Sequence, residues 1–324
     1  MKKFLSHASA RATLALLGVF LVGCLFNAEG AFFSWGTHRD MLRQASEFGI
    51  LACGMTMVIL AAGIDLSVGS VLGLVSVSFS LFSIHWGWPA WASISGGLLV
   101  GTLCGLAAGS LIAFTGMQPF IATLALMTFA RGLAKQVSGG TKITQAIQHS
   151  DGSFEFVDLP PIFGMIDSRI LGGNIAFITI LFLLVVLALG LALRFLRSGR
   201  YLYAIGGNET AARLAGVPVT WTKLVAYGTS GLCSAIAGIC HAAQEQQGDP
   251  EAGATYELTA IAIVVIGGTA LSGGRGGMML TLLGTLTIGY MEKILSINII
   301  GEPGRLMLTG LIIVGAVLFQ KNPK

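Results

Sequence analysis

Long apolar stretches fill most of the chain, and charged residues interrupt them only at intervals. Asp, Glu, Lys and Arg are absent from residues 12–28, 48–64, 66–130, 170–193, 224–244, 258–274, 276–291 and 306–320. A helix needs about 20 mostly apolar residues to cross a bilayer, so residues 66–130 can hold three helices, separated by breaks at 87–89 and 115–119. The pattern predicts about ten transmembrane helices, near residues 12–31, 44–64, 66–86, 89–115, 118–137, 172–197, 222–244, 256–272, 277–297 and 304–320.

The composition indicates that lipid is the solvent. Hydrophobic residues make up 54% of the chain and charged residues 10%, whereas a soluble domain carries about 25% charged residues. Too few polar side chains remain to cover a water-exposed surface, which excludes a soluble enzyme, a nucleic-acid-binding protein and a disordered chain. The 45 glycines among 324 residues favour helices packed backbone to backbone. We expect an all-α polytopic membrane protein, with residues 1–324 forming a single transmembrane domain in the lipid bilayer.

The distribution of charge predicts how the helices are oriented, because basic residues prefer the cytoplasmic side. With the N-terminus inside and ten spans, the inner side collects Lys2, Lys3, Arg11, Arg194, Arg197, Arg200, Arg213, Lys223, Arg275, Lys321 and Lys324. Most acidic residues then fall outside. Both termini are therefore expected in the cytoplasm. The polar stretch 138–170 is expected to be an extracytoplasmic loop, which is either passive or a docking surface.

The N-terminal segment has a second interpretation. Lys2 and Lys3, the apolar run after them and Leu21-Val22-Gly23-Cys24 also fit a lipoprotein-type signal peptide. A chain with many later spans seldom needs such a peptide, so we treat the segment as the first helix.

Four glycines recur at every fourth position in one expected helix. Gly97, Gly101, Gly105 and Gly109 form a flat stripe along which another helix can lie. The stripe predicts a helix-packing face. A face that lines a pore for a polar solute is the alternative, and the two roles are compatible.

Asp65 stands alone in an apolar region, in a stretch that also contains Ser67 and Ser70. A carboxylate is costly to bury in lipid, so we expect it at a helix break or in a watered space. One interpretation is that Asp65 is the N-cap of the next helix. The other is a substrate or proton site on a broken helix.

The stretch from Arg200 to Pro218 contains the signals of a short helix outside the membrane. Asn208 can cap its N-terminus, and Glu209 in the first turn suits the helix dipole. Gly216 then ends the helix, and Pro218 prevents its continuation. A two-turn helix is marginal alone, so it needs its own membrane domain or a partner protein to pack against.

At this stretch the chain resembles the permease subunits of bacterial ABC importers for monosaccharides, of the ribose, xylose and arabinose type. The matching motifs run in family order over nearly the whole chain: residues 63–70, Thr123-Leu124-Ala125, Arg131-Gly132, residues 204–218, residues 267–271 and residues 273–277. Each motif is weak alone, and their combination is specific.

The resemblance implies a ten-helix permease in the bacterial inner membrane that works as a pair, with a second copy or with a related permease. Its partners would be a cytosolic ABC ATPase subunit and an extracytoplasmic sugar-binding protein. By the same resemblance, residues 198–222 form a cytoplasmic coupling loop that receives the motion of the ATPase. The residues that take this role are Gly206, Gly207, Asn208, Glu209, Arg213 and Gly216.

The chain lacks motifs for chemistry of its own. No GxxxxGK[ST] phosphate loop occurs, so we expect no cofactor here and ATP to be bound by the partner subunit. Residues 271–275 look like the signature of an ABC ATPase, but they lie between apolar spans and read better as a turn. The histidines are scattered and the cysteines lie in apolar stretches. We therefore assign no catalytic and no metal-binding residues.

The expected function is the translocation path of an ATP-driven importer for a ribose-like pentose or related sugar. The path is expected to be poorly selective, with candidate polar residues Ser67, Ser70, Ser76, Thr123, Thr128 and Asn298. The alternative is an ion-coupled secondary transporter or channel for a small polar solute that uses Asp65.

Overall fold

A computed structural model describes residues 8–148, 152–301, 303–305, 307–308 and 310–311. In this part of the chain the long elements are all α-helices, and the named strands form two short hairpins. Six helical segments of the described residues are long and apolar enough to cross a membrane. The protein is thus a polytopic helical membrane protein, as the apolar pattern predicts. Both termini and most of the expected helix 304–320 lie outside the described residues.

The helices in chain order are α2 (Ala8–Leu25), the 3-10 turn η1 (Ala31–Phe33), α3 (Trp35–Leu60), α4 (Val68–Ser80), the π-helical turn η2 (Leu81–His85), α5 (Ala90–Thr115), α6 (Pro119–Val137), α7 (Pro161–Ile166), α8 (Phe177–Phe195), α9 (Arg197–Gly207), α10 (Glu209–Leu214), α11 (Val219–Glu245), α12 (Tyr256–Gly267) and α13 (Met278–Ile297). Strand β1 (Ala146–Gln148) pairs antiparallel with β2 (Phe154–Phe156), and β3 (Arg169–Ile170) pairs antiparallel with β4 (Ile175–Ala176).

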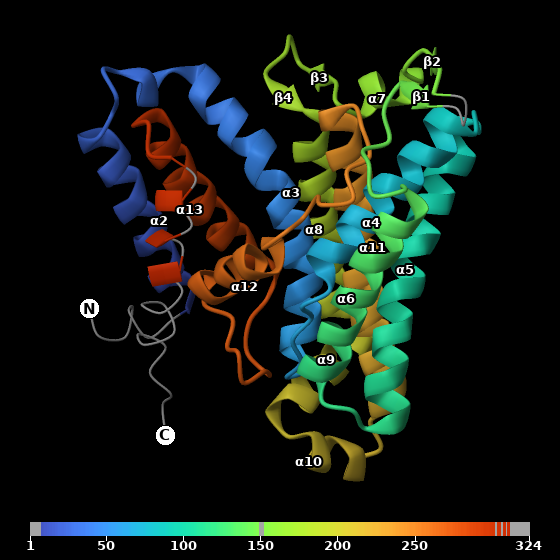
Figure 1. Ribbon diagram of the computed structural model, residues 1–324. Helices are drawn as coiled ribbons and strands as arrows, with labels where there is room; N and C mark the ends of the chain where they lie inside the picture. Colours follow the sequence, from blue (N-terminus) through green and yellow to red (C-terminus); the bar gives the residue numbers. More distant parts are fainter. Residues whose placement is uncertain (1–7, 149–151, 302, 306, 309, 312–324) are drawn as a thin grey trace.

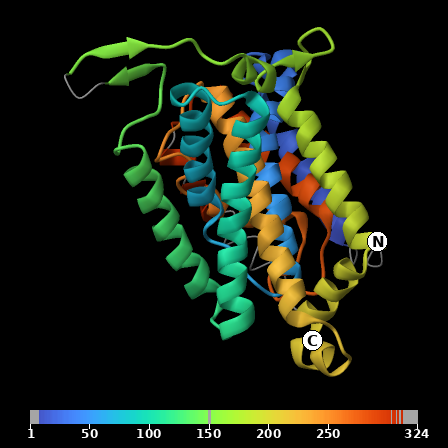
Figure 2. The same cartoon turned by 90° about the vertical axis from the view of Figure 1, so that its right-hand side faces the viewer.

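The two ends of the helix bundle differ in structure (Figure 1). The strands β1–β4 and α7 gather at one end, which we call the hairpin end, and α10 stands at the opposite end, which we call the α10 end. Figure 2 shows β1 and β2 extending sideways from the bundle while α10 remains at the far end. The α10 end is rich in the arginines that the charge pattern assigned to the cytoplasm, among them Arg194 at the end of α8 and Arg197 at the start of α9.

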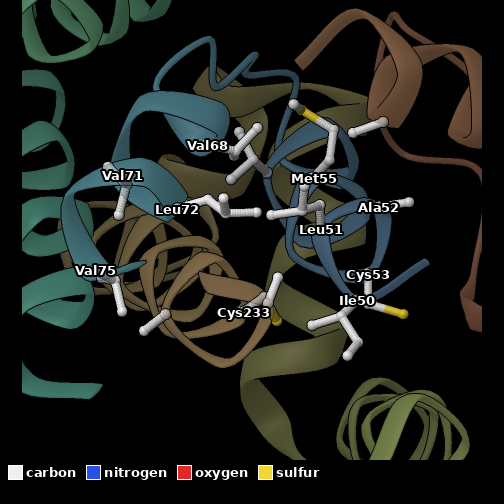
Figure 3. Packing of buried hydrophobic residues seen from close by; sticks show 14 of the residues in the cluster. Ile50, Leu51, Ala52, Cys53, Met55, Val68, Val71, Leu72, Val75 and Cys233 are labelled. Carbon is white, nitrogen blue, oxygen red and sulfur yellow. The ribbon is translucent and has the colours of Figure 1, made fainter. Parts of the chain in front are cut away.

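The centre of the bundle is α11, which packs against α3, α4 and α5. Figure 3 shows buried side chains of α3, such as Leu51 and Met55, meeting Val68 and Leu72 of α4 beside Cys233 of α11. Lipid is as apolar as these side chains, so close packing rather than transfer from water holds the helices together.

Several helices begin or end at the proline and glycine residues that predicted their ends. Pro89 precedes α5, and Pro119 occupies the first turn of α6. Gly116, which follows α5, has a left-handed backbone with φ of 71°. The first charged turns of α3 are also helical, so that helix begins at Trp35 rather than near residue 44.

Two expected helices are too long. The helix expected at 12–31 ends at Leu25, because residues 28–30 adopt left-handed backbone conformations. The helix expected at 256–272 is the twelve-residue α12, which stops before Gly268 with φ of 102°. A helix of that length is too short to cross a bilayer alone.

Residues 61–67 return into the bundle after α3 ends. Asp65 accepts a hydrogen bond from Ser230 Oγ at 2.7 Å, and Ser230 lies near the middle of α11. The next helix, α4, therefore begins inside the bundle. It leaves towards the hairpin end, where His85 Nε2 lies 3.1 Å from the carbonyl oxygen of Thr144.

Residues 246–255 form the counterpart after α11. They run back along α4, because a Cβ added at Gly248 would lie 2.8 Å from Ser80 Cβ, and one added at Gly253 would lie 3.0 Å from Gly69 Cα. Thus α12 also begins inside the bundle, but it leaves towards the α10 end. The starts of α4 and α12 meet at the centre of the protein from opposite directions.

The segment expected as the outer loop 138–170 is folded against α3. Asp167 accepts from Arg43 Nε at 3.2 Å, and Arg169 donates to Asp40 at 2.8 Å. These ion pairs fix α7 and the β3–β4 hairpin at one end of the bundle, a structure that hydropathy did not predict.

Candidate functional site

The short helix α10 is held by the residues that the sequence singled out. Asn208 has an extended backbone, and its Oδ1 accepts a hydrogen bond from the Ala211 N–H at 2.9 Å. Gly216 turns the chain with φ of 81° after the helix ends. The capped two-turn helix is therefore confirmed, although its role stays a prediction.

Glu209 joins α10 to the central helix. Its two carboxylate oxygens accept from Arg213 at 3.0 Å and from Lys223, near the start of α11, at 2.7 Å. Partial burial raises the pKa of Glu209, but the hydrogen bonds and charges of Lys223 and Arg213 outweigh it and hold that pKa below its usual value. The carboxylate is thus ionised at neutral pH and ties α10 to α11.

Three segments meet by their backbones where α9 ends. A Cβ added at Gly206 would collide with the carbonyl oxygen of Leu60, the last residue of α3, and with Gly274 of the turn after α12. The Gly274 N–H donates to the Leu60 carbonyl at 3.1 Å. Only glycine fits at Gly206, whereas Gly207 has open space for a side chain. A displacement of α9 therefore reaches the end of α3 directly.

Helix α9 was not predicted from the sequence. The stretch is rich in arginine and amphipathic, so its charge suggested a loop beside the membrane. The helix buries Leu202 and Ile205, and Tyr203 donates from its hydroxyl to the Gly276 carbonyl at 3.0 Å. A period of three to four in its apolar residues was the available signal.

Asp65 is fully buried at the first re-entrant segment. One carboxylate oxygen accepts from the backbone N–H and the hydroxyl of Ser67 at 3.0 and 2.6 Å, and the other accepts from Ser230. The prediction that Asp65 is the N-cap of α4 is wrong. The N-cap is Ser67, and Asp65 precedes it by two residues in a tight turn. The helix break that we expected at Asp65 is present.

The glycine stripe of α5 lies against α11. A Cβ at Gly105 would lie 2.9 Å from Gly231 Cα, and one at Gly101 would lie 3.2 Å from Ala235 Cα. Gly97 and Gly109 are similarly close to side chains of α11. These contacts describe a packing face, with glycines on both helices.

The six polar path candidates lie at different places. Ser67 is bonded to Asp65, Thr123 donates to the Pro119 carbonyl at 2.9 Å, and Asn298 donates to the Phe26 carbonyl at the hairpin end at 2.9 Å. Ser76 is buried. Ser70 and Thr128 are brought together at one groove.

Glu47 and His241 form a buried polar pair that was not predicted from the sequence. His241 Nδ1 of α11 lies 3.0 Å from Glu47 Oε1 of α3, and only 9% of the Glu47 side chain is exposed. The two residues are far apart in the sequence, so no motif joins them. Each is an isolated polar residue in an apolar helix, which was the available signal.

A helical membrane bundle with re-entrant segments, buried polar groups and a capped helix outside it has the architecture of a membrane transport protein. Residues 39–319 match the family described as the permease component of the branched-chain amino acid transport system. The chain belongs to this family of permease components.

Named relatives refine this assignment. The chain is 38% identical to the ribose import permease of Haemophilus influenzae over 312 residues, 95% of this chain and 91% of that protein. It is 39% identical to the ribose import permease of Bacillus subtilis, over 87% and 84% of the two chains, and 34% identical to a fructose import permease of Rhizobium meliloti, over 99% and 88%. No solved structure matches the chain. The predicted resemblance is confirmed, and the chain is a multi-pass inner-membrane permease component.

Proposed function

We propose that this chain is the membrane-spanning subunit of an ATP-driven importer for a monosaccharide, a ribose-like pentose or a related sugar. The observation that carries the proposal is α10, a capped helix that stands at the end of the bundle and is tied to the central helix through Glu209 and Lys223. The import of ribose or fructose by the relatives supports the substrate class.

In this proposal the α10 end faces the cytoplasm. Its arginines agree with the preference of basic residues for that side. A separate ATPase subunit binds ATP and docks on the exposed face of α10, where Thr210, Ala211 and Leu214 are open to solvent. The hairpin end then faces outward and receives an extracytoplasmic sugar-binding protein. The path is completed by a second copy of the chain or by a related permease.

The contacts of α10 and α9 support a route by which motion of the ATPase reaches the helix bundle. A push on α10 reaches α11 through the Glu209–Lys223 ion pair and reaches the end of α3 through Gly206. Both helices flank residues 61–67, and α11 carries Ser230, which holds Asp65. Closure of the ATPase would therefore shift the re-entrant segment and change access to the centre of the bundle.

Charge reversal on α10 tests the proposal. Glu209→Lys places a third positive charge beside Arg213 and Lys223, and it should separate α10 from α11. In proteoliposomes that contain the chain, its ATPase and its binding protein, we expect ATP-driven sugar uptake to fall at least tenfold while the complex still assembles. Arg197→Glu is the matched control, because Arg197 is an exposed charge at the same end that lies outside α10. Sugar-stimulated ATP hydrolysis coupled to normal uptake in Glu209→Lys would refute the coupling role.

The second candidate is an ion-coupled secondary transporter, which the buried Asp65 at a helix break favours. Uptake driven by ATP with ion gradients collapsed separates the two candidates. Accumulation under a proton or sodium gradient without an ATPase would establish the second.

A further inference from the structure

A groove lies beside the starts of α4 and α12, and polar residues form part of its lining. Its volume is about 480 Å³, within the range of small-molecule sites. The polar residues that line it are Ser70, Thr128, Arg131, Lys135, Thr255 and Glu257. They come from the start of α4, from α6 and from the start of α12.

Arg131 holds the second re-entrant segment beside this groove. Its Nη1 donates to the carbonyl of Pro250 and, at 2.7 Å, to the carbonyl of Ala252. The side chain is partly buried. It therefore fixes residues 246–255 against α6 and contributes a positive charge to the groove wall.

Glu257 also lines the groove. It is in the first turn of α12, and a Cβ added at Gly69 of α4 would lie 2.9 Å from its Oε2. The carboxylate is thus close to the N-termini of two helices, where the helix dipole favours a negative charge. It is a partly buried acceptor at the groove wall.

The mixture of groups suits a neutral polyhydroxyl compound. Each sugar hydroxyl can donate one hydrogen bond and accept others. Glu257 accepts, and Arg131 and Lys135 donate. Thr128 gives its hydroxyl proton to the Leu124 carbonyl, so its oxygen can accept from a sugar. One sugar hydroxyl can therefore donate to Glu257 and accept from Arg131 or Lys135. Hydrogen bonds to charged groups are stronger than those between neutral groups, and a partly enclosed groove increases their effect.

Resting on the proposed function, we propose that this groove binds the sugar in transit and gives the permease a selectivity of its own. Glu257 and Thr128 contact the sugar hydroxyls, and Arg131 positions the wall. The earlier expectation of a poorly selective path does not hold in this proposal. A zwitterionic amino acid is the competing occupant, because the groove carries charges of both signs.

Two near-isosteric variants and a matched control test the groove. Thr128→Val removes the hydroxyl, and Glu257→Gln removes the charge and replaces one acceptor oxygen by a donor, both with little change in volume. Thr229→Val is the control, because the hydroxyl of the half-buried Thr229, like that of Thr128, donates to the carbonyl four residues earlier, at 2.8 Å against 3.1 Å. Thr229 lies on α11 outside the groove.

The assay is the uptake of radiolabelled D-ribose, D-fructose and L-leucine by proteoliposomes with the full transporter. We expect each groove variant to lower the uptake of the transported sugar at least fivefold or to change the ribose-to-fructose ratio at least threefold. ATPase stimulation by the loaded binding protein should stay within twofold of wild type, and Thr229→Val should match wild type in all respects.

Several outcomes would overturn the groove proposal. One is wild-type sugar uptake and ratio in both variants. Another is loss of ATPase stimulation together with uptake in both variants and in the conservative Thr128→Ser, which would assign the residues to folding. A third is preferential uptake of L-leucine by the wild type. Sugar uptake by the wild type without ATP would instead refute the proposed function, and the groove variants could still be scored on that uptake.

Discussion

The close approach of α5 and α11 makes a strong prediction for Gly105→Ala. The added methyl carbon would lie 2.9 Å from both the backbone nitrogen and the Cα of Gly231, and closer still to the carbonyl oxygen of Tyr227. Ordinary carbon contacts need about 3.5–4.0 Å, so the helices must separate by roughly 1 Å. The obstacle is backbone, so no side-chain rotation can relieve it.

The free-energy cost of the steric clash can be compared with the stability that alanine adds through its higher helix propensity. Forcing an extra methyl group into a packed interior costs about 1–3 kcal/mol, and a backbone obstacle places Gly105→Ala near the upper limit. Gly18→Ala in α2 is the matched control, because no neighbouring atom lies within 4 Å of the added carbon. That variant should gain about 0.5–1 kcal/mol from higher helix propensity. The same chemical change is thus expected to have opposite signs at the two positions.

Reversible unfolding in detergent with increasing SDS, followed by tryptophan fluorescence, measures both free energies of unfolding. We expect the two variants to differ by about 3 kcal/mol, with wild type between them. If Gly105→Ala unfolds within 0.5 kcal/mol of wild type, the backbone contact between α5 and α11 is not formed, and the stripe needs another explanation.

Three further predictions concern the groups that join α10 and the first re-entrant segment to the bundle. Asp65→Ala should lower the free energy of unfolding by about 2–4 kcal/mol, because Ser230 and the Ser67 N–H lose their acceptor inside the bundle; SDS titration checks this, and Asp65→Asn should cost less. The lowered pKa of Glu209 means that its ion pair stabilises the α10 attachment above the ordinary glutamate pKa and is lost as pH falls through the folded value. The protection factors of the α10 amides should therefore be unchanged from pH 8 to 6 and should fall once the pH drops below the ordinary glutamate pKa, and equal protection factors at both extremes would contradict the ion pair. Leu214, 85% exposed, can be replaced by Ala with less than 0.5 kcal/mol effect on unfolding, but pull-down of the ATPase should weaken.

Features with local signals could be predicted from the sequence. Asn208, Gly216 and Pro218 mark α10 within a few residues of one another, because capping and turn formation depend on neighbouring groups. The breaks before Pro89 and Pro119 follow for the same reason. Hydropathy also predicted most of the spans, since it reflects the transfer of a whole segment into lipid.

Features that depend on depth or on distant partners could not be predicted. Hydropathy is an average over a window of residues. It therefore cannot show that residues 246–255 return into the bundle or that α12 crosses only part of the bundle. The contact of Glu47 with His241 joins α3 to α11, and the tie from Arg131 to Ala252 joins α6 to a re-entrant segment. Each was visible only as a lone polar residue, without its partner.

The continuity of α11 connects the two sites that the sequence treated separately. Lys223 binds α10 and Ser230 binds Asp65, and both lie on this one helix. Seven residues of helix rise about 10.5 Å, and α11 is unbroken between them. If α11 moves as a rigid body, the proposed mechanism carries a displacement of α10 through Lys223 to Ser230. The hydrogen bond from Ser230 to Asp65 would then either move with α11 or break, and either event would alter the start of α4, where Ser70 lines the groove.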